Sequence, residues 1–102
     1  MDNYLVSVEL PMTKILYFHK TIKDFRRLLN NFHIVIQKSV NPNTKKEIQI
    51  CYDLIELATN YDLYSVECCK IKGKIKRFRL NFTFLNPENS EKFVAACHVL
   101  KF

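Results

Sequence analysis

Apolar and polar residues alternate most regularly in residues 78–84, near the end of the chain. A period of two with aromatic residues on one side is typical of a half-buried β-strand. Before Gly73 the apolar positions fall on odd numbers, and after it they fall on even numbers, so a turn belongs at this glycine. The pattern predicts a β-hairpin whose second strand enters the core. Its apolar face consists of Phe78, Leu80, Phe82 and Phe84.

Residues 86–102 follow this strand and have the signals of a helix. Asn86 can cap a helix, and Pro87 then stands at the first helical position, where its missing N–H costs little. Ser90 is a second possible cap, one turn later. The segment predicts an amphipathic helix that covers a sheet. The apolar side of the helix carries Phe93, Ala96, Cys97 and Leu100.

Short apolar runs rich in β-branched and aromatic residues predict strands through much of the remaining chain. Pro11 makes the first of them an edge strand or a lead-in. The pattern leaves residues 22–32 and 53–59 open between helix and strand. Turns are expected at residues 41–46 and 60–62. The predicted strands cover residues 4–10, 13–19, 33–40, 48–51 and 63–71.

About seven strands with frequent turns, followed by one helix, predict an α+β fold that is mostly β. We expect a partly open antiparallel barrel or sandwich capped by the C-terminal amphipathic helix. The chain has 102 residues and 48% hydrophobic content, which suits a single domain with one core.

The predicted hairpin also carries the densest positive charge of the chain, whose net charge is +6. This charge suits a nucleic acid, an anionic membrane or an acidic partner. A solvated basic face, or protection of an exposed strand edge, explains it equally well. The aromatic residues share the face opposite Arg79, which argues against stacking on single-stranded nucleic acid. The basic residues are Lys70, Lys72, Lys74, Lys76, Arg77 and Arg79.

The four cysteines do not have the spacing of a metal site. Cys68 and Cys69 are adjacent and therefore point to opposite faces of a strand. The N-terminus does not resemble a signal peptide, so we expect reduced thiols in an intracellular compartment. No segment approaches the ~20 apolar residues of a membrane-spanning helix.

Catalytic signatures are also missing from the sequence. It contains no phosphate-binding loop, dinucleotide-binding glycine motif or nucleophile elbow. His98 follows Cys97, but consecutive helical residues diverge by about 100° and do not form a catalytic pair. We therefore expect no enzyme activity, no catalytic residues, no metal and no cofactor.

Several short strands followed by one amphipathic helix resemble the pleckstrin-homology (PH) superfold. Residues 76–82, with the sequence K-R-F-R-L-N-F, precede an acid-started helix containing Phe93, Cys97 and Leu100. This end of the chain resembles the PH-like N-terminal domain of the Rec subunit of the meiotic Rec–Mei–Mer complex. Residues 33–38 and 48–57 match that family more loosely.

The resemblance implies a non-enzymatic scaffold that binds short segments of partner proteins during meiotic DNA double-strand-break formation. It also implies a nuclear, chromosome-associated protein, in which residues 1–102 are one PH-like domain at the N-terminal part of a longer chain. Arg79 is the partner-contacting position within the matched motif. Contacts with DNA or another acidic surface would be weak. On the preceding strand of the hairpin, the further partner-contacting residues would be Val66, Cys68, Lys70 and Lys72.

Two alternatives remain open. The same hairpin suits a basic module that binds nucleic acid or phosphoinositides, with Lys74, Lys76 and Arg77 completing its basic patch. The second alternative is a small viral or accessory protein that forms a homodimer through an exposed strand.

Overall fold

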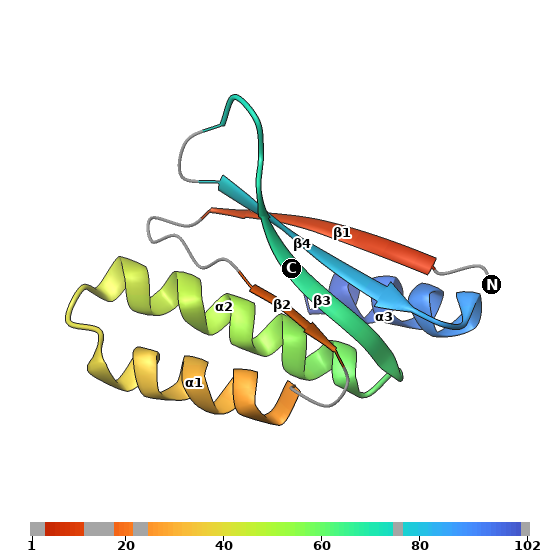
Figure 1. The fold of residues 1–102 in the computed structure, drawn as a ribbon, viewed down its shortest axis with the longest axis horizontal. Helices are drawn as coiled ribbons and strands as arrows, with labels where there is room; N and C mark the ends of the chain where they lie inside the picture. The colour runs from red at the N-terminus through yellow and green to blue at the C-terminus, as the bar shows by residue number, and fades with distance from the viewer. Residues whose placement is uncertain (1–3, 12–17, 22–24, 75–76, 101–102) are drawn as a thin grey trace.

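The structure is a computed structural model that describes residues 4–11, 18–21, 25–74 and 77–100 (Figure 1). Within these ranges, four strands form one antiparallel sheet and three helices complete the fold. The elements are β1 (Tyr4–Pro11), β2 (Phe18–Thr21), α1 (Phe25–Lys38), α2 (Pro42–Thr59), β3 (Leu63–Lys70), β4 (Arg77–Phe84) and α3 (Pro87–Val99).

The strand order in the sheet is β1-β4-β3-β2, so the last strand of the sequence pairs with the first. Val6 lies opposite Phe82, and Leu10 lies opposite Phe78. β3 and β4 form a hairpin at the centre of the sheet, and Lys70 opposite Phe78 is its last pair before the loop. β1 and β2 are the two edges.

The core lies between the sheet and the helices. The alternation predicted for β4 is confirmed, since Phe78, Leu80, Phe82 and Phe84 are all buried. α3 adds Phe93, which is fully buried; its ring centroid lies 5.0 Å from that of Phe82 and 5.3 Å from that of Phe84. The packing predicted for Phe93 is therefore confirmed. Leu100 is 57% exposed, so the prediction that it packs on the sheet is wrong.

The expected seven-stranded, PH-like barrel is wrong. Residues 33–38 belong to α1 and residues 48–51 belong to α2, where the sequence pattern favoured strands. Residues 53–59, which the pattern left open between helix and strand, are also part of α2. Both helices contribute one buried face to the core, and the sheet remains open. Residues 33–38 and 48–57 therefore do not match strands of the PH-like family, because both segments are helical.

α1 shows why its pattern was misread. Its Ile34-Val35-Ile36 run has strong β propensity, but Ile34 is 47% exposed and only Ile36 is buried. Spacings of three and four residues separate the buried side chains, as expected for one face of a helix. This spacing also settles the ambiguous residues 25–32 as helical. The buried face consists of Phe25, Leu28, Phe32 and Ile36.

α2 begins where the sequence suggested a turn at residues 41–46. The Asn41 side chain accepts hydrogen bonds from the backbone N–H groups of Asn43 (2.9 Å) and Thr44 (3.3 Å). Pro42 occupies the first turn of the helix. Capping of free N–H groups by asparagine, with proline just behind it, starts a helix.

The remaining elements agree with the sequence pattern where the structure describes them. β1, β3, β4 and α3 are confirmed, and Asn86 caps α3 by accepting from the N–H of Glu88 at 2.8 Å. Gly73 has a φ of 80° in the β3–β4 loop, as the predicted turn requires. The strand predicted at residues 13–19 lies largely outside the described residues, which include only its end, in β2.

Candidate functional site

The sheet face opposite the core is polar and open. Ser7, Asn81 and Glu67 come from three neighbouring strands and lie in register across it. The Ser7 hydroxyl donates to Asn81 Oδ1 at 2.7 Å, and Asn81 Nδ2 donates to Glu67 Oε1 at 3.1 Å. Asn81 Nδ2 also lies 3.6 Å from the Cys69 sulfur. These hydrogen bonds tie the three strands together on the solvent side.

Glu9 connects β1 to the base of the hairpin. Its Oε1 accepts from Arg77 Nε at 2.6 Å and from Lys74 Nζ at 3.0 Å. Hydrogen bonds from Arg77 and Lys74 favour the ionised carboxylate and lower the pKa of Glu9 from its usual 4.5. One negative charge thus neutralises part of two positive charges, and the site stays positive.

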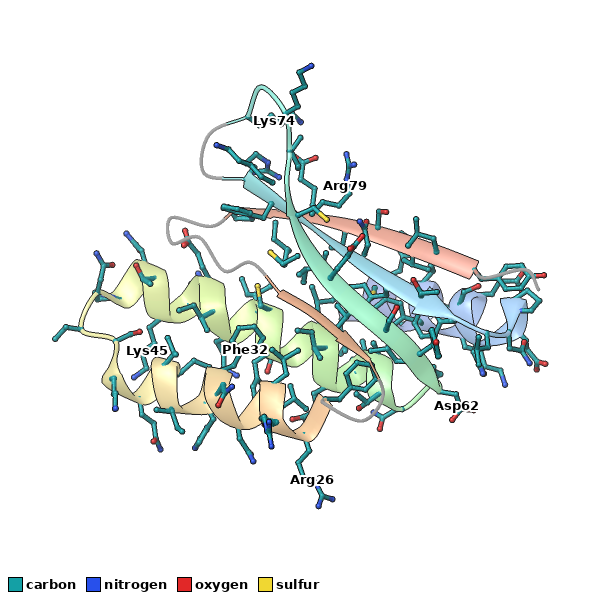
Figure 2. The ribbon with its side chains drawn as sticks, in the orientation of Figure 1. Arg26, Phe32, Lys45, Asp62, Lys74 and Arg79 are labelled. Carbon is teal, nitrogen blue, oxygen red and sulfur yellow. The ribbon has the colours of Figure 1, made fainter. Side chains whose placement is uncertain are left out.

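We use the name basic hairpin for the end of the β3–β4 unit formed by Lys70, Lys72, Lys74, Arg77 and Arg79. Lys70, Lys72, Lys74 and Arg79 are exposed, whereas Arg77 is partly covered. Figure 2 shows Lys74 at the far tip of the loop and Arg79 nearer to the sheet. The structure therefore gathers these predicted site residues at one end of the molecule.

Three other predicted site residues do not join this surface. Val66 is fully buried and Cys68 is 5% exposed, because both face the core opposite Phe82 and Leu80. Lys76 lies outside the described residues.

Sequence reasoning missed Glu9, which is 65 positions before Lys74. Nothing in its local pattern distinguishes it from the other acidic residues. Glu9 could have been found only from the pairing of β1 with β4. This pairing places Glu9 opposite Arg79, two residues from the Pro11–Arg77 pair.

None of the four cysteines is paired in a disulfide, and burial raises the pKa of each thiol, which makes the thiols poor nucleophiles. Burial raises the pKa of Cys51 to about 12 and that of Cys68 to about 11. Cys68 and Cys69 point to opposite faces of β3, as predicted. Among the described residues, no three His, Cys, Asp or Glu side chains are grouped so that they could hold a metal ion.

Hollows elsewhere on the described surface do not assemble a reactive group. One lies between α1 and the start of β3, where Arg26, Tyr52 and Asp62 approach apolar side chains. Another runs between β1 and α3 and contains Glu91 and His98 beside Leu5 and Val94. Neither places a nucleophile beside a hydrogen-bonded base in the described contacts.

Comparisons with known proteins provide no assignment. No protein-family model matches the chain, and no curated protein or solved structure shows significant similarity to it. In the part of the chain that the structure describes, no helix has the length and apolar character needed to cross a membrane.

Proposed function

We propose that this domain binds nucleic acid through the basic hairpin. The observation that carries the proposal is the placement of Lys70, Lys72, Lys74 and Arg79, which are exposed together at one end of the sheet. Lysine and arginine near phosphates release condensed counterions, which supplies affinity without any sequence readout.

The position of Arg77 and Arg79 in the sheet argues against edge protection. Lysines commonly block the exposed edge of a sheet from pairing with another chain. β4 carries Arg77 and Arg79 and lies between β1 and β3, whereas the described part of β2 pairs with β3 only between Ser65 and Cys68 and does not reach Lys70. Edge protection therefore does not account for Arg77 and Arg79, and their positive charge supports a ligand-binding role.

The same topology argues against capture of a partner segment as an added strand beside β4. β4 pairs with β1 on one side and β3 on the other, so its backbone groups are already used. A ligand must then be held by side chains, and the exposed ones are cationic. Lysine and arginine side chains bind phosphate through charge-assisted hydrogen bonds.

The partner-binding function in meiotic break formation stays a prediction, as do the nuclear location and the absence of enzyme activity. The resemblance that suggested them included a PH-like barrel, and the open sheet removes that structural support. The basic hairpin is still present in the open sheet, and its positive charge favours binding of a polyanion.

The test compares two triple variants with equal charge loss. Lys70→Ala/Lys72→Ala/Arg79→Ala removes three of the five cations of the basic hairpin, whereas Lys38→Ala/Lys45→Ala/Lys46→Ala removes three exposed cations from the α1–α2 end. In Figure 2, Lys45 lies far from Lys74. Circular dichroism would first establish that both variants are folded.

Fluorescence anisotropy with a labelled DNA duplex, at several salt concentrations, would then measure affinity. The hairpin variant should bind at least ~10-fold more weakly, and its log–log salt slope should fall by about 2.7 if three phosphate contacts are lost. The control variant should stay close to the parent. Equal weakening of both variants, or binding only to phosphoinositide vesicles, would overturn the proposal.

A further inference from the structure

We propose that β1 pairs with β1 of a second copy of this chain, so that two four-stranded sheets join into one across a two-fold axis. This inference goes beyond nucleic-acid binding and does not depend on it. Three features of the described residues support it: a regular edge strand without cations, a groove beside that edge, and side chains that complement one another when the edge meets itself.

β1 is a long and regular edge strand. Among the described strands it pairs with β4 alone, and its eight residues, Tyr4–Pro11, keep one register without a bulge. Natural edge strands are often blocked by lysines or bulges, because their open N–H and C=O groups pair readily with another strand. β1 contains no lysine or arginine, and its single charged residue, Glu9, is hydrogen-bonded to Arg77 of β4. Pro11 blocks only the last position, so the rest of the edge suits a further strand.

A groove runs along this edge between β1 and α3. Its lining includes Leu5 and Val6, and because consecutive residues of a strand point to opposite faces, the groove opens at the edge itself. Leu5 is 61% exposed, and α3 contributes Val94 and Ala95 to the other side of the groove. Val6 and Val8 pack against the core but are only half-buried. A neighbouring strand would extend the core over them and cover this apolar surface.

Antiparallel pairing about Ser7 matches β1 to a second copy of itself. Val6 then lies opposite the partner's Val8 on the core side, and such pairs of β-branched residues stabilise neighbouring strands. Glu9 and the partner's Glu9 lie on either side of the axis, about 13 Å apart along the strands, so like charges do not meet. Pro11, which has no N–H to donate, falls outside the paired residues 4–10.

The same two-fold axis brings α3 beside the partner's α3. Figure 1 shows α3 running along β1 and β4, both of which it contacts, and it starts near the Tyr4 end of β1. The midpoint between Val94 and Ala95 lies about 11 Å along α3, and Ser7 lies about 10 Å along β1, so one axis passes near both. Since α3 spans β1 and β4, and strands are about 4.8 Å apart, the two helix axes come within about 10 Å, the spacing of packed helices.

Polar groups on α3 complement one another in this arrangement. Glu91 and His98 both line the groove, and they lie equally far from the midpoint between Val94 and Ala95. In an antiparallel pair, Glu91 therefore lies opposite the partner's His98, whose ring N–H can donate to the carboxylate. The two helix dipoles also run in opposite directions, which favours the arrangement. Because strand and helix both match their own copies about one axis, the occupant of the groove is a second copy of this chain.

Sedimentation velocity of the full chain, over a wide range of concentrations, would measure the dissociation constant of the dimer. Residues 4–10 and one side of α3 form a smaller interface than the ~20–30 residues a side of a standard one, so the dimer should dissociate on dilution. Leu5→Lys places a charge at the edge and should raise the dissociation constant at least ~10-fold. Val40→Lys is the matched control, because Val40 is 96% exposed between α1 and α2, and it should leave the constant unchanged. A monomer at every concentration, or equal effects of the two variants, would overturn the inference.

An exchange of side chains tests the contact between the two α3 helices. Glu91→Lys and His98→Glu should each raise the dissociation constant at least ~5-fold, because two donors or two acceptors then face each other. The double variant Glu91→Lys/His98→Glu restores opposite groups across the axis, so its constant should return close to that of the parent. Circular dichroism would show that all three variants are folded. A double variant that dimerises no better than either single variant would overturn the arrangement.

Cysteines placed on β1 test the register. In Ser7→Cys, mild oxidation with diamide should join the two copies through position 7, because these side chains face each other across the axis. In Leu5→Cys the two introduced thiols would lie about 13 Å apart and should not be joined. Mass spectrometry of the cross-linked peptides would distinguish these links from links through the native cysteines. Joining through position 5, or no joining through position 7, would overturn the proposed pairing.

Discussion

Replacement of Phe93 by alanine tests whether α3 is held to the sheet by one side chain. Phe93 is the fully buried residue of α3, and its ring packs at a tilt against Phe82 and Phe84. Phe→Ala changes in a core cost about 3–5 kcal/mol, through lost burial and the cavity that remains. The two aromatic contacts place this site toward the upper end of that range.

The expected loss is a large part of the ~5–15 kcal/mol by which a domain is usually stable. For a domain of about 100 residues, a loss of ~4 kcal/mol lowers the melting temperature by roughly 16–32 °C. Urea and thermal unfolding followed by circular dichroism at 222 nm would measure both quantities, since the chain has no tryptophan.

The neighbouring Val94→Ala variant is the matched control. Val94 lies on the same helix and is 38% exposed, so its truncation should cost under ~1 kcal/mol. If Phe93→Ala destabilises the domain no more than Val94→Ala does, the packing of α3 described above is incorrect.

Three further predictions concern the open face, the thiols and the turn. The lowered pKa of Glu9 means that its ion pairs add stability above its unfolded value of 4.5 and lose it as the pH falls through the lower folded value. Urea midpoints of the parent and of Glu9→Gln should therefore differ at pH 6 and converge toward about pH 2; a constant difference would contradict this. At pH 8, iodoacetamide should leave Cys51 and Cys68 unmodified in the folded chain, because burial raises the pKa of each thiol. Mass spectrometry would show this, and rapid alkylation of either thiol without denaturant would argue against its burial. Gly73→Ala should cost about 1–2 kcal/mol in urea unfolding because of the positive φ, and Gly73→Asn should cost less; equal costs would point away from a left-handed turn.

Much of the hairpin and α3 could be predicted because their signals are local. The alternation of Phe78 to Phe84 defines which face of β4 is buried whatever strand lies beside it. The Asn-Pro pair at Asn86 and Pro87 marks the start of α3 in the same way. The same signal at Asn41 and Pro42 starts α2, but the surrounding polar residues suggested a turn.

α1 and the candidate site depended on contacts that a local pattern does not contain. The Ile34-Val35-Ile36 run favours a strand by propensity, yet packing of one face against the core selects a helix. Glu9 contacts the basic hairpin only because β1 pairs with β4. Long-range pairing of this kind links residues with no shared sequence signal.

The sequence by itself determined where the hairpin turns, which side of β4 is apolar, where α3 begins and where positive charge is concentrated. Each of these follows from interactions within a few residues. Only the tertiary structure decided the number of strands, the order β1-β4-β3-β2 and the central place of the cationic strands. Those features depend on how the apolar faces of three helices and one sheet are buried together, and that burial is a property of the whole chain.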